Sequence, residues 1–360
     1  MSTDLEPKEA ADRLSKDLGP DLMSLYQDDD VTEFGANPVH KRGQVWVDRR
    51  STGMTQTDAY VRESQARQFL RRVASFKSTT LTKDDPTIEV SLPDPTWGGA
   101  RLSGSIRPAT SGPAFCIRKF EDTLIPLESY AEDGIMSNRQ YDRLINAIKS
   151  YDTIAVVGGT GSGKTTLLMS ILNRIGQFYP DERIVSIEDT PELQLQTLWN
   201  WHPFYTFEVD QPYKGSVEYL VHKSLRWSPS RIVVGECRGP GIVALFEGIL
   251  SGHPGGAFTY HATTIPKFFE RVLINCMRES DTEEAHKRNI GSAVDLVIIL
   301  EKAMDERYVK QMAAVDTYSD GDYEYDRIWR DPSSQPEVYL PEKVREGRKA
   351  VEANGVAGEM

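Results

Sequence analysis

A run of glycines that ends in a lysine and two threonines points most directly to chemistry. It reads Gly158, Gly159, Thr160, Gly161, Ser162, Gly163, Lys164, Thr165, Thr166. Glycines let consecutive backbone N–H groups turn toward an anion without obstructing side chains. Lys164 can place a positive charge against the β- and γ-phosphates of a nucleotide, and the Thr165 hydroxyl can ligate Mg²⁺. An apolar strand expected at 153–157 precedes this loop and an apolar helical stretch at 167–175 follows it, which predicts a phosphate-binding P-loop.

Acidic residues follow two further apolar stretches that are expected to be strands. Glu236 comes after the strand at 231–234, and Gly235 stands where many P-loop ATPases carry an aspartate. Glu188 comes after a strand at 183–187. Because the carboxyl ends of parallel strands meet at one edge of a sheet, both acids are expected beside the P-loop, where a carboxylate can hold Mg²⁺ or orient water. Each acid alone could belong to a solvated turn, but together with a P-loop they favour a shared site.

Two histidines, His253 and His261, lie in a glycine-rich segment at 251–264 that has neither cysteine nor carboxylate. A metal site would need further ligands at suitable spacing, and the segment offers none. His261 follows a strand expected at 257–260, so it should reach the same sheet edge, where it can hydrogen-bond a γ-phosphate. His253 precedes that strand and is expected to cap a turn.

The composition of the whole chain limits the possible classes of protein. Its 360 residues are 39% hydrophobic, which excludes global disorder, and its net charge of −12 predicts no stable binding to duplex DNA. Cys116, Cys237 and Cys276 lie too far apart for a zinc ribbon or a disulfide framework. The polar N-terminus is unlike a signal peptide, and the apolar runs are too short to span a bilayer. We expect a cytosolic protein or one peripheral to a membrane.

The pattern of expected elements divides the chain into two domains. Residues 21–119 alternate short strands with an amphipathic helix around 66–74, which predicts a small α+β domain. Residues 138–330 contain short apolar strands separated by helices, as in an α/β domain with a parallel sheet. We expect a mobile N-terminus at 1–20, a linker at 120–137 and a charged tail at 331–360.

Four motifs in order carry a resemblance to a known family: GGTGSGKTT, IEDTPEL, LRWSPSRIVVGECRG and GHPGGAFTYHATT. Together with the upstream AFCIRKFEDTLIPLESYAEDGIMSNRQYDRL they resemble the secretion-type traffic ATPases, and most closely the TrbB-type conjugal-transfer ATPases, over roughly residues 20 to 320. The resemblance implies a RecA-like P-loop ATPase domain behind a PAS-like α+β domain. It also implies ATP and Mg²⁺ as cofactors and a homohexameric ring.

The resemblance further implies roles for matching residues. Glu236 would be the general base for the attacking water, and Glu188, in the acidic box, would help to position Mg²⁺ or water. With Thr165 they would form the metal contacts. His261 would sense the γ-phosphate.

Arginines matching the family are expected to supply positive charge to the phosphates. Arg226 and Arg238 match arginines that contact phosphates or a neighbouring subunit. Arg118 matches one that closes over the nucleotide from the N-terminal domain, and Arg107 is a weaker candidate of that kind. Each could instead be a surface residue or form a structural ion pair.

The sequence also departs from the family pattern. Ser230 stands where relatives commonly carry an aspartate, with little expected effect. The aromatic stretch at 199–207 lacks an arginine that relatives often have nearby. This stretch could pack as a loop or form a docking surface for a partner.

The function that these features favour is an ATPase motor for conjugative DNA transfer or type IV secretion, acting with channel proteins at the inner membrane. The alternatives are a pilus or type II secretion motor, a nucleotide-gated assembly scaffold, and a translocase acting directly on DNA. GHPGG, Gly239 after Arg238, and the absence of a four-cysteine insertion favour the first. Basic residues along the N-domain helix could be a solvated face or could dock on a membrane or partner: Arg67, Arg71, Arg72, Lys77.

Overall fold

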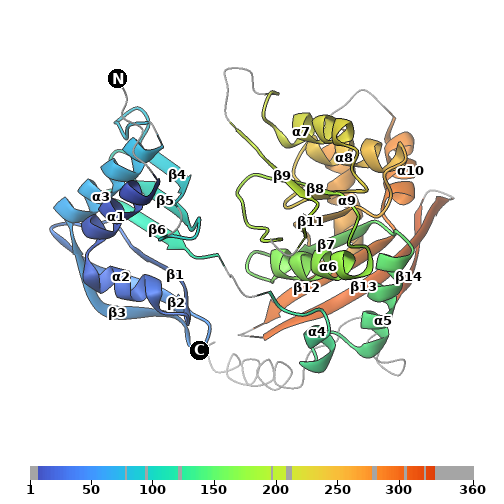
Figure 1. The fold of residues 1–360 in the computed structure, drawn as a ribbon, viewed down its shortest axis with the longest axis horizontal. Helices are drawn as coiled ribbons and strands as arrows, with labels where there is room; N and C mark the ends of the chain where they lie inside the picture. Colours follow the sequence, from blue (N-terminus) through green and yellow to red (C-terminus); the bar gives the residue numbers. More distant parts are fainter. Residues whose placement is uncertain are drawn as a thin grey trace, which may run out of the picture. The chain divides into compact units, whose positions relative to one another are not determined.

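Figure 1 shows the computed structural model, which describes residues 7–77, 79–93, 96–120, 124–195, 198–207, 213–277, 282–303, 306–319 and 322–328. The chain divides into two compact units, Met1–Asp122 and Thr123–Met360. Each unit has its own sheet and its own hydrophobic core.

The first unit is built on an antiparallel sheet of six strands in the order β3-β2-β1-β6-β5-β4. Its elements are α1 (Pro7–Leu18), α2 (Pro20–Gln27), β1 (Val31–Ala36), β2 (Arg42–Arg49), β3 (Gly53–Arg62), α3 (Glu63–Phe76), β4 (Thr87–Ser91), β5 (Arg101–Ser105) and β6 (Ala114–Arg118). The apolar stripe predicted for α3 is buried: Ala66, Phe69, Leu70, Val73, Ala74. The prediction of an α+β domain is confirmed.

The prediction of a mobile segment at 1–20 is wrong for residues 7–18, which form α1. Ala11, Leu14 and Leu18 recur at i, i+3 and i+7 and are buried in the core of the first unit. This spacing is that of an amphipathic helix, and it is the sequence signal for α1. The Gln65 side chain donates to the Leu18 carbonyl at 2.7 Å, which ties α1 to α3. Residues 1–6 lie outside the described part.

The second unit is an α/β domain built on an eight-stranded sheet in the order β14-β13-β12-β7-β11-β10-β8-β9. The strands from β12 to β9 pair in parallel, and β13 and β14 extend the sheet antiparallel. Its strands are β7 (Ile154–Gly158), β8 (Ile184–Glu188), β9 (Trp201–Tyr205), β10 (Arg231–Val234), β11 (Ala257–Tyr260), β12 (Leu296–Ala303), β13 (Glu306–Ser319) and β14 (Asp322–Arg327).

Helices cover both faces of this sheet (Figure 1). They are α4 (Ser129–Glu132), α5 (Asn138–Lys149), α6 (Lys164–Phe178), α7 (Val217–Ser224), α8 (Gly241–Leu250), α9 (Ile265–Cys276) and α10 (Glu283–Ala293). Along β7, Ala155 and Val157 belong to the core shared with α7 to α10, whereas Ile154 and Val156 belong to the core shared with α4 to α6. Burial on both faces explains why the strands read as continuous apolar runs.

Two predictions about connecting segments need correction. The stretch at 120–137 was expected to be a linker, but Leu127, Tyr130 and Met136 are buried in a core of the second unit, so the described residues from 124 onward belong to that unit. The aromatic stretch at 199–207 is not simply a loop, because β9 within it pairs in parallel with Ile184–Glu188 at the sheet edge. The charged tail predicted at 331–360 lies outside the described residues.

Candidate nucleotide-binding site

The order of strands in the sheet brings the predicted residues to one edge. The P-loop follows β7, His261 follows β11, Glu236 lies two residues past β10, and Glu188 ends β8. These are four neighbouring parallel strands, in the order β7, β11, β10, β8, so their carboxyl ends lie side by side. The arrangement expected from the sequence is therefore present.

The P-loop is a compact turn between β7 and the first residue of α6. Gly161 and Gly163 have φ values of 71° and 91°, in the left-handed region that glycine adopts without penalty. Lys164 is only 9% exposed, and its Nζ donates to the Gly159 carbonyl at 2.9 Å. Open space lies where side chains at Gly159 and Gly161 would stand, because no atom comes within 4 Å of a Cβ there. The loop can therefore admit an anion close to its backbone.

Thr165, the first hydroxyl residue of α6, meets a carboxylate that sequence reasoning did not assign. Its Oγ1 donates to Glu192 Oε2 at 3.1 Å. A hydroxyl beside a carboxylate offers the oxygen ligands that Mg²⁺ prefers, and Mg²⁺ in such sites keeps waters and substrate oxygens as its other ligands. The residues present therefore fit Mg²⁺. Glu192 is the second glutamate of IEDTPEL, and that motif was the available signal.

Glu188 is buried behind this carboxylate and holds its loop. Its Oε1 accepts from the backbone N–H groups of Glu192 at 3.0 Å and Leu193 at 2.8 Å. The side chain of Glu188 is 2% exposed, and among the described residues its Oε2 has no hydrogen-bond partner. Burial raises the pKa of Glu188 to about 7, against the opposing effect of the two N–H groups. Gly235 leaves room for it, since a Cβ there would lie 2.9 Å from Glu188 Cγ.

Glu236 is held by two partners on the site edge. Arg238 binds it through both carboxylate oxygens, with Nε–Oε1 and NH2–Oε2 distances of 2.8 and 2.6 Å. His261 Nε2 lies 2.8 Å from Glu236 Oε1. Burial raises the pKa of Glu236, but Arg238 and His261 together outweigh it, and the net pKa is lowered. Burial, and then the charge of Lys164, lower the pKa of His261, which favours the neutral imidazole at pH 7.

The remaining arginines occupy different places. Arg226 lies in a 3₁₀ turn, Leu225–Trp227, before the start of β10 and thus away from the edge that carries Glu236. Arg118 ends β6 in the first unit and is exposed, and Arg107 there donates through Nε to the Ser111 carbonyl at 2.6 Å. His253 Nδ1 lies 3.3 Å from the Gly248 carbonyl at the end of α8, consistent with its predicted turn-capping role.

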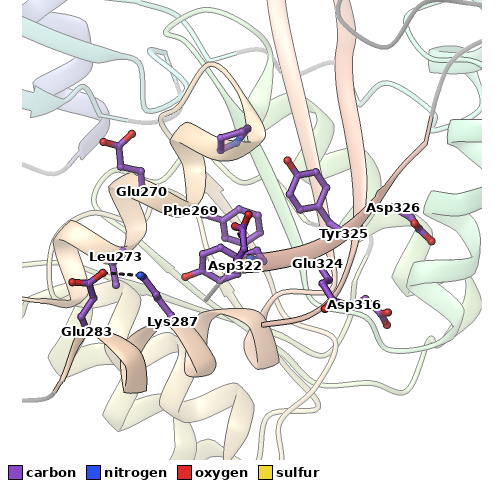
Figure 2. A pocket seen from close by; sticks show the side chains of 12 residues that line it. Phe269, Glu270, Leu273, Glu283, Lys287, Asp316, Asp322, Glu324, Tyr325 and Asp326 are labelled. Carbon is purple, nitrogen blue, oxygen red and sulfur yellow. Dashed lines mark hydrogen bonds and ion pairs between the residues drawn. The ribbon is translucent and has the colours of Figure 1, made fainter. Parts of the chain in front are cut away.

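A cavity of about 730 Å³ lies elsewhere in the second unit, and Figure 2 shows its lining. Phe269, Glu270 and Leu273 come from α9, Glu283 and Lys287 from α10, and the rest mainly from β14. No residue of the P-loop lines it.

Among the described residues no helix is long and apolar enough to cross a membrane. The fold and the strand-edge geometry define an α/β protein of the P-loop nucleotide-binding class.

Comparisons with known proteins agree with this class. The model of the family described as "Type II/IV secretion system protein" matches residues 54–333. The "Conjugal transfer protein TrbB" of Rhizobium radiobacter is 31% identical over 314 residues, which cover 87% of this chain and 92% of that protein. The "Probable conjugal transfer protein TrbB" of Sinorhizobium fredii is 30% identical over 312 residues, covering 87% and 91%.

A solved structure supports the fold alone. The X-ray structure of the Legionella pneumophila ATPase DotB matches with a TM-score of 0.60 at 18% identity and covers 87% of this chain and 82% of that chain. The chain belongs to the type II/IV secretion system protein family, the secretion-type traffic ATPases, and is close to the TrbB proteins within it.

Proposed function

We propose that this protein is a motor that hydrolyses ATP with Mg²⁺ and couples the reaction to movement during conjugative DNA transfer or type IV secretion. The observation that carries the proposal is the order of strand ends: P-loop, His261 and Glu236 follow three neighbouring parallel strands. The similarity to TrbB proteins supports the conjugative setting.

Nucleotide binding would begin with an exchange of partners at Lys164. Its ammonium now binds the neutral Gly159 carbonyl, and triphosphate oxygens are stronger, charged acceptors. Thr165, with Glu192 beside it, would hold Mg²⁺, which supplies charge neutralisation on the β- and γ-phosphates. Glu188 would act through Glu192, because it binds the backbone of that loop.

Glu236 would accept the proton of the attacking water. Its lowered pKa keeps it ionised at neutral pH, but both its oxygens are bound to Arg238. Arg238 is exposed and can turn toward a γ-phosphate, which would free Glu236 as the base and add positive charge where the transition state needs it. His261, on the strand between the P-loop and Glu236, would contact the γ-phosphate and report its presence.

A ring of six subunits would complete the site. Arg226 lies away from the edge with Glu236, so in this proposal it serves a neighbouring subunit. Arg118 would contribute from the N-terminal domain, with Arg107 as a weaker candidate. Delivery of an arginine by closure couples hydrolysis to movement. The partners would be channel proteins at the inner membrane, with the motor on the cytoplasmic side and peripheral to that membrane.

The test combines mass and activity on the same samples. Light scattering with and without a Mg·ATP analogue should show a hexamer of the 40.5 kDa chain, with ATPase rate rising as it assembles. Glu236→Gln should bind ATP yet lose turnover, and Lys164→Ala should lose binding. A fully active monomer would refute the ring, and wild-type turnover by Glu236→Gln would refute the assignment of the base.

A further inference from the structure

The hairpin of β12 and β13 reaches past the end of the P-loop strand. β12 pairs in parallel with β7 as far as Leu300, opposite Gly158, and then continues to Ala303. β13 begins at Glu306 and returns antiparallel, with Arg307 opposite Lys302. This register places Arg307 beyond the point where β7 gives way to the P-loop.

Arg307 contacts the P-loop at two places. Its Nε donates to the Gly161 carbonyl at 3.3 Å. Its aliphatic stem lies against Gly163, because a Cβ on that glycine would stand 3.2 Å from Arg307 Cδ and 3.7 Å from Nε. Gly161 and Gly163 are the two P-loop residues with left-handed φ, and Lys164 follows directly. Arg307 therefore binds the turn that sets the direction of the loop just before its lysine.

This contact has a consequence for nucleotide binding. A P-loop binds phosphate through N–H groups that point inward, so a donor that holds an outward carbonyl favours the same orientation of the backbone. Glycines leave the loop many other conformations, and restricting them in advance reduces the entropy lost on binding. Among the described residues no carboxylate pairs with the Arg307 side chain, and its hydrogen bond goes to the Gly161 carbonyl.

We propose that Arg307 is a positioning residue that sets nucleotide affinity by holding the Gly161–Gly163 turn in its phosphate-binding conformation. The inference rests on the proposed nucleotide function and adds a residue from the C-terminal hairpin to that site. The Nε–H donor is the group that acts, and the positive charge of the guanidinium is secondary.

Two substitutions separate the donor from the charge. Arg307→Gln keeps an N–H donor at the same number of bonds from the backbone as Nε but removes the charge. Arg307→Lys keeps the charge but places a carbon at that position. Arg307→Ala removes both. Arg288→Gln, on α10, is the matched control because it removes a charge from an exposed arginine that pairs with Glu284 away from the P-loop.

Dissociation constants for a fluorescent ATP analogue and for its ADP counterpart would be measured by titration, with kcat and KM from steady-state hydrolysis. We expect Arg307→Ala and Arg307→Lys to bind both nucleotides about three- to tenfold more weakly. Arg307→Gln and Arg288→Gln should stay within about twofold of wild type. Because the residue acts on binding, kcat should change less than KM.

The opposite rank order would overturn the proposal: if Lys preserves affinity and Gln loses it, the charge acts on the nucleotide directly. Unchanged affinity in all variants, or a loss confined to kcat, would also overturn it. If wild type and Lys164→Ala both fail to bind nucleotide, the proposed function fails and this inference fails with it. Binding by wild type alone, with no effect at position 307, would refute only the inference.

Discussion

The Thr165 hydroxyl donates a hydrogen bond to the Glu192 carboxylate at 3.1 Å and thereby joins the P-loop helix to the segment after β8. Glu192 is placed there by Glu188, whose Oε1 binds the backbone N–H groups of Glu192 and Leu193. The two glutamates of this segment therefore differ in position. Glu188 is buried and binds the loop backbone, and Glu192 faces the Thr165 hydroxyl, where the ligands suit Mg²⁺.

Glu192→Gln should weaken the response to Mg²⁺. The substitution keeps the shape and a hydrogen-bond acceptor for Thr165 but removes the negative charge beside the metal position. Partners next to metal ligands typically affect metal affinity or activity by about 10- to 100-fold, so we expect the half-saturating Mg²⁺ concentration to rise within that range. Mg²⁺ titration of ATPase rate measures it. Glu270→Gln, at an exposed position of α9, is the control, and an equal effect there would exclude a local role for Glu192.

The residues of the site differ in how far the sequence could reveal them. Lys164 belongs to a glycine-rich signature that defines its own loop, and Glu236 lies two residues past β10, so motif and strand pattern place them at the edge. Glu192 lies four residues beyond the end of β8, and its direction depends on hydrogen bonds to Glu188. Arg307 enters the site only through the pairing of β12 with β7. Contacts that arise from tertiary pairing leave no local pattern.

Glu188 should make the protein less stable as pH rises. Its pKa is about 7 in the folded protein, against an ordinary value of 4.5, so the folded state binds more protons than the unfolded state between these values. The contribution of Glu188 to the free energy of unfolding is therefore largest below pH 4.5 and is lost as pH rises through 7. A shift of this size corresponds to roughly 3 kcal/mol at full ionisation.

Glu188→Gln tests this dependence, because the glutamine amide stays uncharged at every pH used and therefore adds no pH dependence to the free energy of unfolding. Urea unfolding at pH 6 and at pH 8.5 should show a smaller loss of stability on the alkaline side in the variant than in wild type. An identical pH dependence of the two proteins would show that Glu188 titrates at its ordinary value. The amide can still accept from Glu192 and Leu193, so the loop is retained.

Arg238→Ala should change both the rate and its pH dependence. Arg238 is the main charged partner that lowers the pKa of Glu236, so its removal leaves His261 alone to oppose burial and raises that pKa. The acidic limb of the kcat/KM profile should therefore move to higher pH, and turnover should fall by more than about tenfold if Arg238 also serves the phosphate. Arg238→Lys should restore part of the acidic limb. If the pH profile of Arg238→Ala is unchanged, the acidic limb does not report the ionisation of Glu236.

Sequence patterns predict some elements of the fold correctly and leave two others unpredicted, for different reasons. The buried strands of the second unit and the wide stripe of α3 were found from their patterns. Helix α1 is as amphipathic as α3, so its helical spacing of apolar residues was a usable signal that the prediction of a mobile segment ignored. Strand β9 was missed because an edge strand rich in aromatics lacks a clear alternation, and its pairing with β8 determines its conformation.

Arg231 should be the side chain whose loss most disturbs the end of the sheet opposite the P-loop. Its side chain is fully buried at the start of β10, where Nε lies 2.6 Å from Glu182 Oε2 and NH1 donates to the Gly255 carbonyl at 3.2 Å. The Arg231 guanidinium also lies 4.2 Å from the centre of the Tyr151 ring. Removing one member of such a pair leaves the other charge buried without compensation.

For Arg231→Met we therefore expect the free energy of unfolding to fall by about 3–5 kcal/mol, measured by urea denaturation at pH 7. Arg143→Met is the matched control, since its pair with Asp152 is partly exposed and should contribute no more than about 1 kcal/mol. The folded fraction of Arg231→Met should bind a fluorescent ATP analogue as wild type does, because the substitution lies at the opposite edge from the P-loop. Equal losses in the two variants would show that burial of Arg231 does not determine its contribution, and weakened nucleotide binding would show that the two edges of the sheet are coupled.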